Sequence, residues 1–243
     1  MVFVVGVVLM RSAGCVINDY ADRDFDGRVW RTKDRPIATG EVRPKEALVL
    51  FGVLCVLAAF LAIWLNKLAI ELSIVAVALA ASYPFLKRFT HLPQVYLGLA
   101  FGWGIPMAFA AEINRVPAVA WLLFTANIFW TLAYDTAYAM ADRDDDRKIG
   151  VKSSAILFGQ WDRIMVGLCH AITLGLLYQV GVLAHLGLVY DGGLLAAFGF
   201  ALYEQKLLWA RQPLDCFRAF LNNNWFGGSV FVGLVAAYLG RPL

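Results

Sequence analysis

The chain alternates between long apolar runs and short polar connections. Each apolar run is roughly 17 to 25 residues long, the length at which a helix crosses a hydrocarbon core of about 30 Å. The runs lack the period-two alternation of strands, and strands cross membranes only as closed barrels. The pattern predicts eight membrane-spanning helices, at about residues 2–18, 46–65, 69–86, 94–111, 117–140, 161–184, 188–206 and 225–240.

Composition agrees with this interpretation. Hydrophobic residues make up 60% of the 243 residues and charged residues 16%, and the mean hydropathy is +0.66. These values are too apolar for a soluble domain of this length. We therefore expect an all-α, polytopic transmembrane helix bundle, with residues 1–243 in a single domain. The four cysteines and three histidines show no metal-ligand spacing, so we interpret the cysteines as small apolar packing residues and the histidines as polar residues with hydrogen-bond partners rather than as catalysts.

The distribution of Lys and Arg predicts the orientation of the bundle. Of the 21 basic residues, 17 lie in four connections that fall on the same side of the membrane if the eight spans are correct. Cytoplasmic loops carry such an excess of Lys and Arg. These connections are thus expected in the cytoplasm, and they comprise residues 19–45, 87–93, 141–163 and 206–224.

Two acidic clusters stand at the exits of predicted spans on this cytoplasmic side. Each contains two aspartates four residues apart, which share a face if the helix continues, and basic residues follow each pair. Carboxylate oxygens suit Mg²⁺, which typically takes one or two carboxylates together with substrate phosphates. Two such faces brought together would make a Mg²⁺–diphosphate site. The residues are Asn18, Asp19, Asp22 and Asp26 in the first cluster and Asp142 and Asp146 in the second.

Two other interpretations of the acidic clusters are less favoured. Solvated loops with balanced charges would explain one cluster, but two similar clusters at span exits on one side favour function. The stretch from Asp22 to Gly27 also resembles the start of an EF-hand loop. That assignment fails because Lys33 stands where the loop needs a bidentate glutamate.

Two charged residues lie deeper in the predicted spans. Arg11 precedes Asn18 by seven residues, and Asp135 precedes Asp142 by seven, so each lies about two turns below its cluster on a similar face. Charges at such depth usually face a bundle interior or a polar cavity. Two roles are open: an Arg11–Asp135 pair that joins helices, or a polar pocket for a second, anionic substrate.

Small residues predict a close contact in the span at 94–111. Gly98 and Gly102 have the GxxxG spacing that lets helix backbones approach, and Gly104 and Pro106 follow them. We expect close helix packing and a kink here.

The sequence around the acidic clusters resembles the UbiA superfamily of intramembrane aromatic prenyltransferases. The pattern Asn18-Asp19-x-x-Asp22-x-x-x-Asp26 is similar to the family's first aspartate motif, and Asp142-x-x-x-Asp146 to its second. Four longer strings resemble the branch that prenylates 4-hydroxybenzoate, and the resemblance covers almost the whole chain. The strings are residues 10–19, Arg35-Pro36, Tyr83-Pro84-x-x-Lys87-Arg88, and residues 135–159.

This resemblance implies a helix bundle whose active site opens to the cytoplasm under a cap formed by residues 19–45 and 141–163. It implies transfer of a polyprenyl group from polyprenyl diphosphate to the ring carbon ortho to the hydroxyl of 4-hydroxybenzoate, in ubiquinone biosynthesis. The cofactor would be Mg²⁺, with membrane lipid and the two substrates as partners and no nucleic acid. The implied metal ligands are Asp19, Asp22, Asp26, Asp142 and Asp146.

The resemblance also implies roles for residues outside the two aspartate motifs. Asn18, Lys87, Arg143 and Lys152 would contact the diphosphate, and the ring of Tyr83 would shield an allylic cation. Arg11 would meet the carboxylate of 4-hydroxybenzoate. The catalytic residues that the resemblance implies are Asp22, Asp26, Asp142, Asp146 and Asp135. Of these, Asp135 would either orient Arg11 or help to activate the phenol.

Family members have nine spans, so we expect the first of them to be missing before Val2. Among other functions, a relative with another aromatic acceptor, such as homogentisate, a naphthoate or haem, comes nearest. A CDP-alcohol phosphotransferase is disfavoured because its single aspartate signature is absent. A divalent-cation transporter is disfavoured because the carboxylates gather at one mouth, whereas a permeation route needs polar groups across the membrane.

Overall fold

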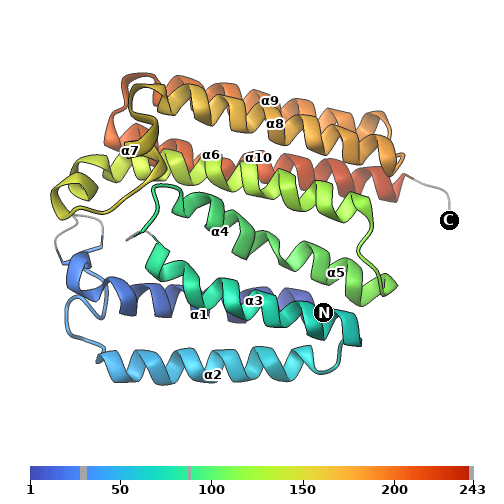
Figure 1. The fold of residues 1–243 in the computed structure, drawn as a ribbon. Coiled ribbons are helices and arrows are strands. Elements are labelled where there is room, and N and C mark those ends of the chain that lie inside the picture. The colour runs from blue at the N-terminus through green and yellow to red at the C-terminus, as the bar shows by residue number, and fades with distance from the viewer. Residues whose placement is uncertain (28–31, 87–88, 241–243) are drawn as a thin grey trace. The chain divides into compact units, whose positions relative to one another are not determined.

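The computed structural model in Figure 1 describes residues 1–27, 32–86 and 89–240. Within these ranges the chain consists of helices joined by turns and short connections, without strands. The helices fall into two compact units. One comprises Met1–Phe89 and Trp103–Val116, and the other comprises Thr90–Gly102 and Pro117–Leu243.

The first unit is built on the helix that carries the first acidic cluster. Helix α1 packs against α2 and α3, and α3 packs against α5. Asn66, just before α3, donates a hydrogen bond of 2.6 Å from Nδ2 to the carbonyl of Ala110 in α5. The helices of this unit are α1 (Val2–Asp26), α2 (Pro44–Ala62), α3 (Lys67–Leu86) and α5 (Gly104–Ile113).

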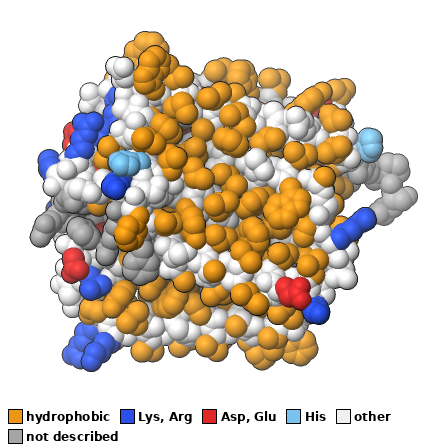
Figure 2. Space-filling view, in the orientation of Figure 1, with side chains coloured by type: hydrophobic (Ala, Val, Ile, Leu, Met, Phe, Trp, Pro, Cys, Tyr) orange, Lys and Arg blue, Asp and Glu red, His pale blue; other side chains and the backbone are white. Residues whose placement is uncertain are grey.

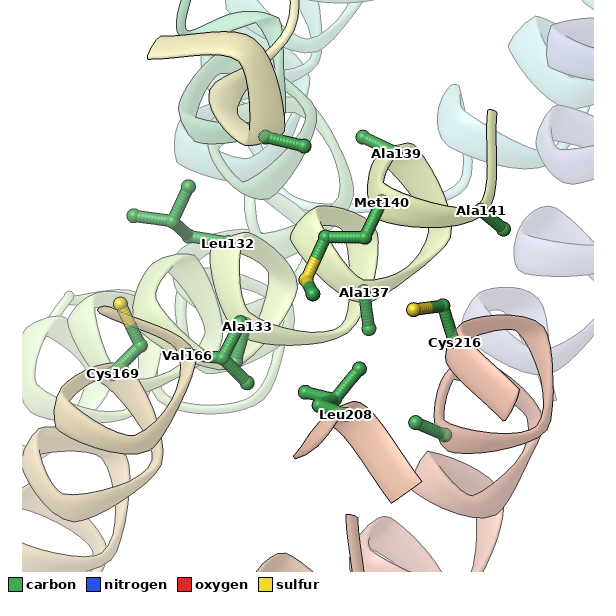
Figure 3. Packing of buried hydrophobic residues seen from close by; sticks show 12 residues of the cluster. Leu132, Ala133, Ala137, Ala139, Met140, Ala141, Val166, Cys169, Leu208 and Cys216 are labelled. Atoms are coloured by element: carbon green, nitrogen blue, oxygen red, sulfur yellow. The ribbon is translucent and has the colours of Figure 1, made fainter. Parts of the chain in front are cut away.

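The second unit is centred on α6, which packs against α4, α8 and α10, while α9 packs against α8 and α10. Small buried side chains of α6, including Ala133 and Ala137, lie close to Val166 of α8 and Cys216 of α10 in Figure 3. Small residues let membrane helices approach closely. The α-helices of this unit are α4 (Pro93–Gly102), α6 (Ala118–Ile149), α7 (Ser154–Phe158), α8 (Asp162–Leu183), α9 (Leu188–Leu207) and α10 (Pro213–Leu239), with 3₁₀ turns η1 (Gly159–Trp161) and η2 (Leu208–Ala210).

Glycines mark the closest helix contacts, as the GxxxG spacing predicts. A Cβ at Gly98 would lie 2.9 Å from the Cα of Ile128 in α6, and one at Gly102 would lie 2.7 Å from Nδ2 of Asn127. The helix also breaks where the kink is predicted, between the end of α4 at Gly102 and the start of α5 at Gly104. A second close approach, of α9 and α10, was not predicted from the sequence.

Each of the eight predicted spans coincides with helix over most of its length, although α2 ends at Ala62, three residues before the predicted end of its span; α4 and α5 together account for the span at 94–111. By length and composition, four helical stretches in the described ranges can cross a membrane: Val2–Asp24, Pro44–Ala62, Pro93–Ile113 and Ser154–Leu183. Large hydrophobic side chains are exposed along the helices, and they cover most of the face in Figure 2. The chain is an all-α membrane protein, and the number of spans stays a prediction.

The structure differs from the sequence pattern at the cytoplasmic ends of two spans. The apolar runs end near residues 18 and 140, but α1 continues to Asp26 and α6 to Ile149. Polar residues do not end a helix unless a breaker follows, and the first glycines are Gly27 and Gly150. Gly150 adopts the left-handed conformation typical of a helix C-cap, with φ of 73°. The first part of each predicted cap loop is therefore helical.

Candidate functional site

The first acidic cluster lies on the last three turns of α1. Because the helix is continuous to Asp26, the spacings of three and four residues place the carboxylates on one face. Asp22 and Asp26 are buried, with 4% and 6% of their surface exposed. Buried carboxylates require charged or hydrogen-bonding partners.

Arg35 provides such a partner. Its Nη1 atom lies 2.8 Å from Oδ1 of Asp19 and 3.1 Å from Oδ2 of Asp26. One nitrogen thus joins carboxylates that are two helical turns apart, which confirms that Asp19 and Asp26 face the same side. Burial raises the pKa of the Asp26 carboxyl above its ordinary value; the Arg35 guanidinium opposes this effect, and the Asp22 carboxylate adds to it.

The donor set on α1 fits Mg²⁺. It offers hard carboxylate oxygens, and two of them already converge on one cationic nitrogen. Within the described ranges, no three His, Cys, Asp or Glu residues form a ready metal cage. Mg²⁺ in proteins typically keeps several waters and uses one or two carboxylates together with substrate phosphates.

The second acidic cluster lies at the end of α6. Asp142 is buried and Asp146 half-buried, and both belong to the same continuous helix, so they share a face as predicted. The amide of Val151 donates a 3.0 Å hydrogen bond to the carbonyl of Asp146, which fixes the end of the helix. The two clusters belong to different units, so their use of shared cations stays a prediction.

Arg143, expected from the resemblance to contact diphosphate, forms an ion pair with Asp162 at the start of α8. Asp162 is fully buried, and it also accepts hydrogen bonds from Nε of Arg211 at 3.0 Å and from the backbone amide of Arg163 at 2.6 Å. This cluster ties the end of α6 to α8 and to the turn before α10. Sequence reasoning missed Asp162, because its partners lie 19 and 49 residues away.

The remaining predicted site residues lie in both units. In the first unit Arg11 is exposed on α1 and Tyr83 half-buried on α3; in the second, Asp135 is half-buried on α6 and Lys152 follows that helix. Lys87 lies outside the described residues. Because Arg11 and Asp135 belong to different units, both interpretations of this pair stay predictions.

A buried polar network in the second unit was also missed. Glu204 of α9 accepts hydrogen bonds from Asn222 at 2.9 Å and Asn223 at 3.0 Å, both on α10. Asn223 in turn accepts one of 3.0 Å from the indole of Trp130 on α6. His170 belongs to this network, with Nε2 3.4 Å from Asn223 Oδ1, in agreement with its interpretation as a polar residue with a hydrogen-bond partner.

Comparison with known proteins identifies a family and several relatives that match this chain. The model of the UbiA prenyltransferase family matches residues 1–231. The chain is 59% identical to a 4-hydroxybenzoate octaprenyltransferase of Methylococcus capsulatus, over 98% of this chain and 82% of that protein. It is 58% identical to the protein of the same name from Alkalilimnicola ehrlichii, over 97% of this chain and 80% of that one.

Solved structures support the same fold. A UbiA homologue from Aeropyrum pernix K1, in its apo form, matches with a TM-score of 0.81 and 27% identity, over 95% of this chain and 88% of that one. A UbiA homologue from Archaeoglobus fulgidus, bound to GPP and Mg²⁺, matches with a TM-score of 0.69 and 17% identity, over 96% of this chain and 87% of that one. The second likeness concerns the fold alone.

Proposed function

Because the chain belongs to the UbiA prenyltransferase family, we propose that it transfers a polyprenyl group from polyprenyl diphosphate to 4-hydroxybenzoate. The bond between the allylic carbon and the diphosphate oxygen breaks, and a carbon–carbon bond forms at the ring position ortho to the hydroxyl. The ring carbon then loses its proton, and diphosphate leaves. The observation that carries this proposal is the 59% identity over nearly the whole chain to a protein named for this reaction, with both aspartate motifs present.

The carboxylates of the two motifs bind the metal in this proposal. Asp19, Asp22 and Asp26 of α1 do so together with Asp142 and Asp146 of α6, and Asn18 contacts the diphosphate. When bound, Mg²⁺ neutralises charge that develops on the departing diphosphate. The convergence of Asp19 and Asp26 on one nitrogen of Arg35 supports this role, because it brings two oxygen donors within reach of one cation.

Basic and aromatic residues complete the diphosphate end of the site. We assign Lys87, Arg143 and Lys152 to the diphosphate oxygens, and the face of the Tyr83 ring to the allylic cation. In the structure the Arg143 guanidinium is paired with Asp162. Asp162 thus fixes the direction of the Arg143 side chain next to Asp142.

The aromatic acceptor is assigned to the deeper charged residues. The Arg11 guanidinium would bind the carboxylate of 4-hydroxybenzoate, which orients the phenol toward the aspartate motifs. Asp135 would either orient Arg11 or accept the phenol proton. Both residues lie within helices, about two turns from the motifs that they serve.

The reaction belongs to ubiquinone biosynthesis and takes place in the bacterial inner membrane. The excess of Lys and Arg in the connections that carry the aspartate motifs supports a cytoplasmic site. Polyprenyl diphosphate would then keep its tail in the lipid and its charged head at the cytoplasmic surface.

An acceptor assay tests the proposal. The full chain, in membrane vesicles, is supplied with a prenyl diphosphate, Mg²⁺ and either 4-hydroxybenzoate or homogentisate. We expect diphosphate release and prenylated 4-hydroxybenzoate only with Mg²⁺, and a raised KM for 4-hydroxybenzoate in Arg11→Ala. Preference for homogentisate would move the chain to another acceptor class, and ion flux without product would contradict the proposal.

A further inference from the structure

Arg35 occupies the position between two carboxylates that are assigned to the metal. Its Nη1 atom contacts Asp19 at 2.8 Å and Asp26 at 3.1 Å, and Asp22 lies between these residues along the helix. The Arg35 side chain is 28% exposed and that of Asp26 8%. Ion pairs on an open surface are screened by water, whereas a largely covered pair is screened much less.

The backbone around Arg35 is held in place by hydrogen bonds. The amide of Arg35 donates to the carbonyl of Thr32 at 3.0 Å, and the carbonyl of Arg35 accepts from the amide of Thr39 at 2.9 Å. The Thr32 hydroxyl donates to the carbonyl of Asp26 at 3.0 Å. The turn that carries Arg35 is therefore joined to the end of α1, and the guanidinium is directed at the carboxylates.

The charge balance of this region requires a cation. Three carboxylates stand within two turns of one helix face, and two of them have 6% or less of their surface exposed. Like charges at this spacing repel, and burial away from water adds to the cost. In the described part of the chain, Arg35 is the cation that joins Asp19 and Asp26.

We infer that Arg35 competes with Mg²⁺ for the oxygens of Asp19 and Asp26. Its guanidinium contacts the same oxygens that are assigned to the metal, so the two cations exclude each other there. A guanidinium displaced from these oxygens would bind the negatively charged diphosphate. This inference rests on the proposed function, because it assigns a partner to the same carboxylates.

Binding of Mn²⁺ alone, followed by electron paramagnetic resonance on the full chain in nanodiscs, tests the competition without any turnover. Arg35→Gln removes the competing charge, so we expect Mn²⁺ to bind about tenfold more tightly than to the wild type. Arg35→Lys should bind Mn²⁺ about as the wild type does, because a single nitrogen makes both contacts. Unchanged or weaker binding by Arg35→Gln would overturn the inference.

Arg23→Gln is the matched control. Arg23 lies on the same helix and carries the same charge, but it contacts the exposed Asp24 at 3.8 Å and donates to the carbonyl of Tyr20. We expect less than a twofold change in Mn²⁺ affinity for this variant, because exposed charges are screened. An equal gain in Arg23→Gln and Arg35→Gln would reduce the effect to net charge and contradict a specific role for Arg35.

Steady-state kinetics supply a second readout. Loss of the competition with Mg²⁺ and loss of the contact with diphosphate should change two measured constants in opposite directions. In Arg35→Gln the Mg²⁺ concentration for half-maximal turnover should fall, while the KM for prenyl diphosphate should rise about tenfold. Removal of a residue that only stabilised the fold would lower the maximal rate and leave both values unchanged, and that result would overturn the inference.

The failure of this inference differs from the failure of the proposed function. If the wild type binds Mn²⁺ and forms product but Arg35→Gln binds no more tightly, only the role of Arg35 is wrong. If the wild type neither binds Mn²⁺ nor forms product in the presence of prenyl diphosphate, the proposed function itself is wrong. Asp26→Asn, which removes one of the two carboxylates, should weaken Mn²⁺ binding both in the wild type and in Arg35→Gln.

Discussion

Asp162 has no exposed surface, and its carboxylate receives both Arg143 and Arg211. A charge so deeply buried is stable only while its partners are present. The Asp162 carboxylate therefore joins the end of α6, which carries Asp142 and Asp146, to α8 and to the turn before α10.

Asp162→Asn should destabilise the chain, because it preserves the shape of the side chain but leaves two guanidinium groups without a counter-charge. We expect a loss of about 3 kcal/mol in the free energy of unfolding, measured by denaturant titration in mixed micelles. Asp215→Asn is the control: it removes an exposed i,i+3 pair with Arg218. That change should cost about 0.5 kcal/mol or less. Equal losses in the two variants would contradict a structural role for the Asp162 cluster.

Residues of the site differed in how far they could be predicted. The aspartates of both motifs were found because their spacing is local and repeats along the chain. Arg35 was named only in the Arg35-Pro36 string and as one of the basic residues after the first motif, without a role, although it lies just nine residues from Asp26. Glu204 and Asp162 were missed because their partners are set by tertiary packing of α6, α8 and α10, which no local spacing records.

At the scale of the elements, glycine contacts hold α4 against α6. A Cβ at Gly98 would lie 2.9 Å from the backbone of Ile128, which cannot move away as a flexible side chain could. Close backbone approach is therefore a requirement of this helix pair, and the GxxxG spacing was sufficient to predict it.

Gly98→Ala should consequently lower stability by about 1 to 3 kcal/mol, the range for overpacking a well-packed contact. Gly175→Ala in α8 serves as the control, because a Cβ there meets nothing within 4 Å. In a helix interior that change should be neutral or stabilising by up to about 1 kcal/mol. The same denaturant titration compares the two variants, and a Gly98→Ala protein as stable as the wild type would contradict the close contact.

Helix existence was predictable and helix ends were not. Apolar length identified every span segment as helical, because helices satisfy their own backbone hydrogen bonds in lipid. The apolar runs end near residues 18 and 140, and the sequence left open whether the helices continue through the acidic motifs. In the structure these motifs extend α1 and α6, and the i,i+4 geometry of the site depends on that extension.

At the scale of the whole molecule, each of the two units carries one aspartate motif on a helix end. The UbiA family assignment and the overall likeness to the Aeropyrum pernix homologue agree with the sequence prediction of fold and family. The joint action of the two motifs is the central claim of the proposed function. Sequence spacing predicts it, and kinetics of the intact chain test it.

The most direct test measures the rate at which the purified chain in nanodiscs forms prenylated 4-hydroxybenzoate with saturating Mg²⁺. The proteins compared are the wild type, Asp22→Asn, Asp142→Asn and the double variant. We expect each single change to lower the rate about 100-fold or more. The double variant should be little worse than either single one, because residues that act as a unit are not additive. Losses that multiply in the double variant, or a single variant with nearly full activity, would contradict a shared Mg²⁺–diphosphate site.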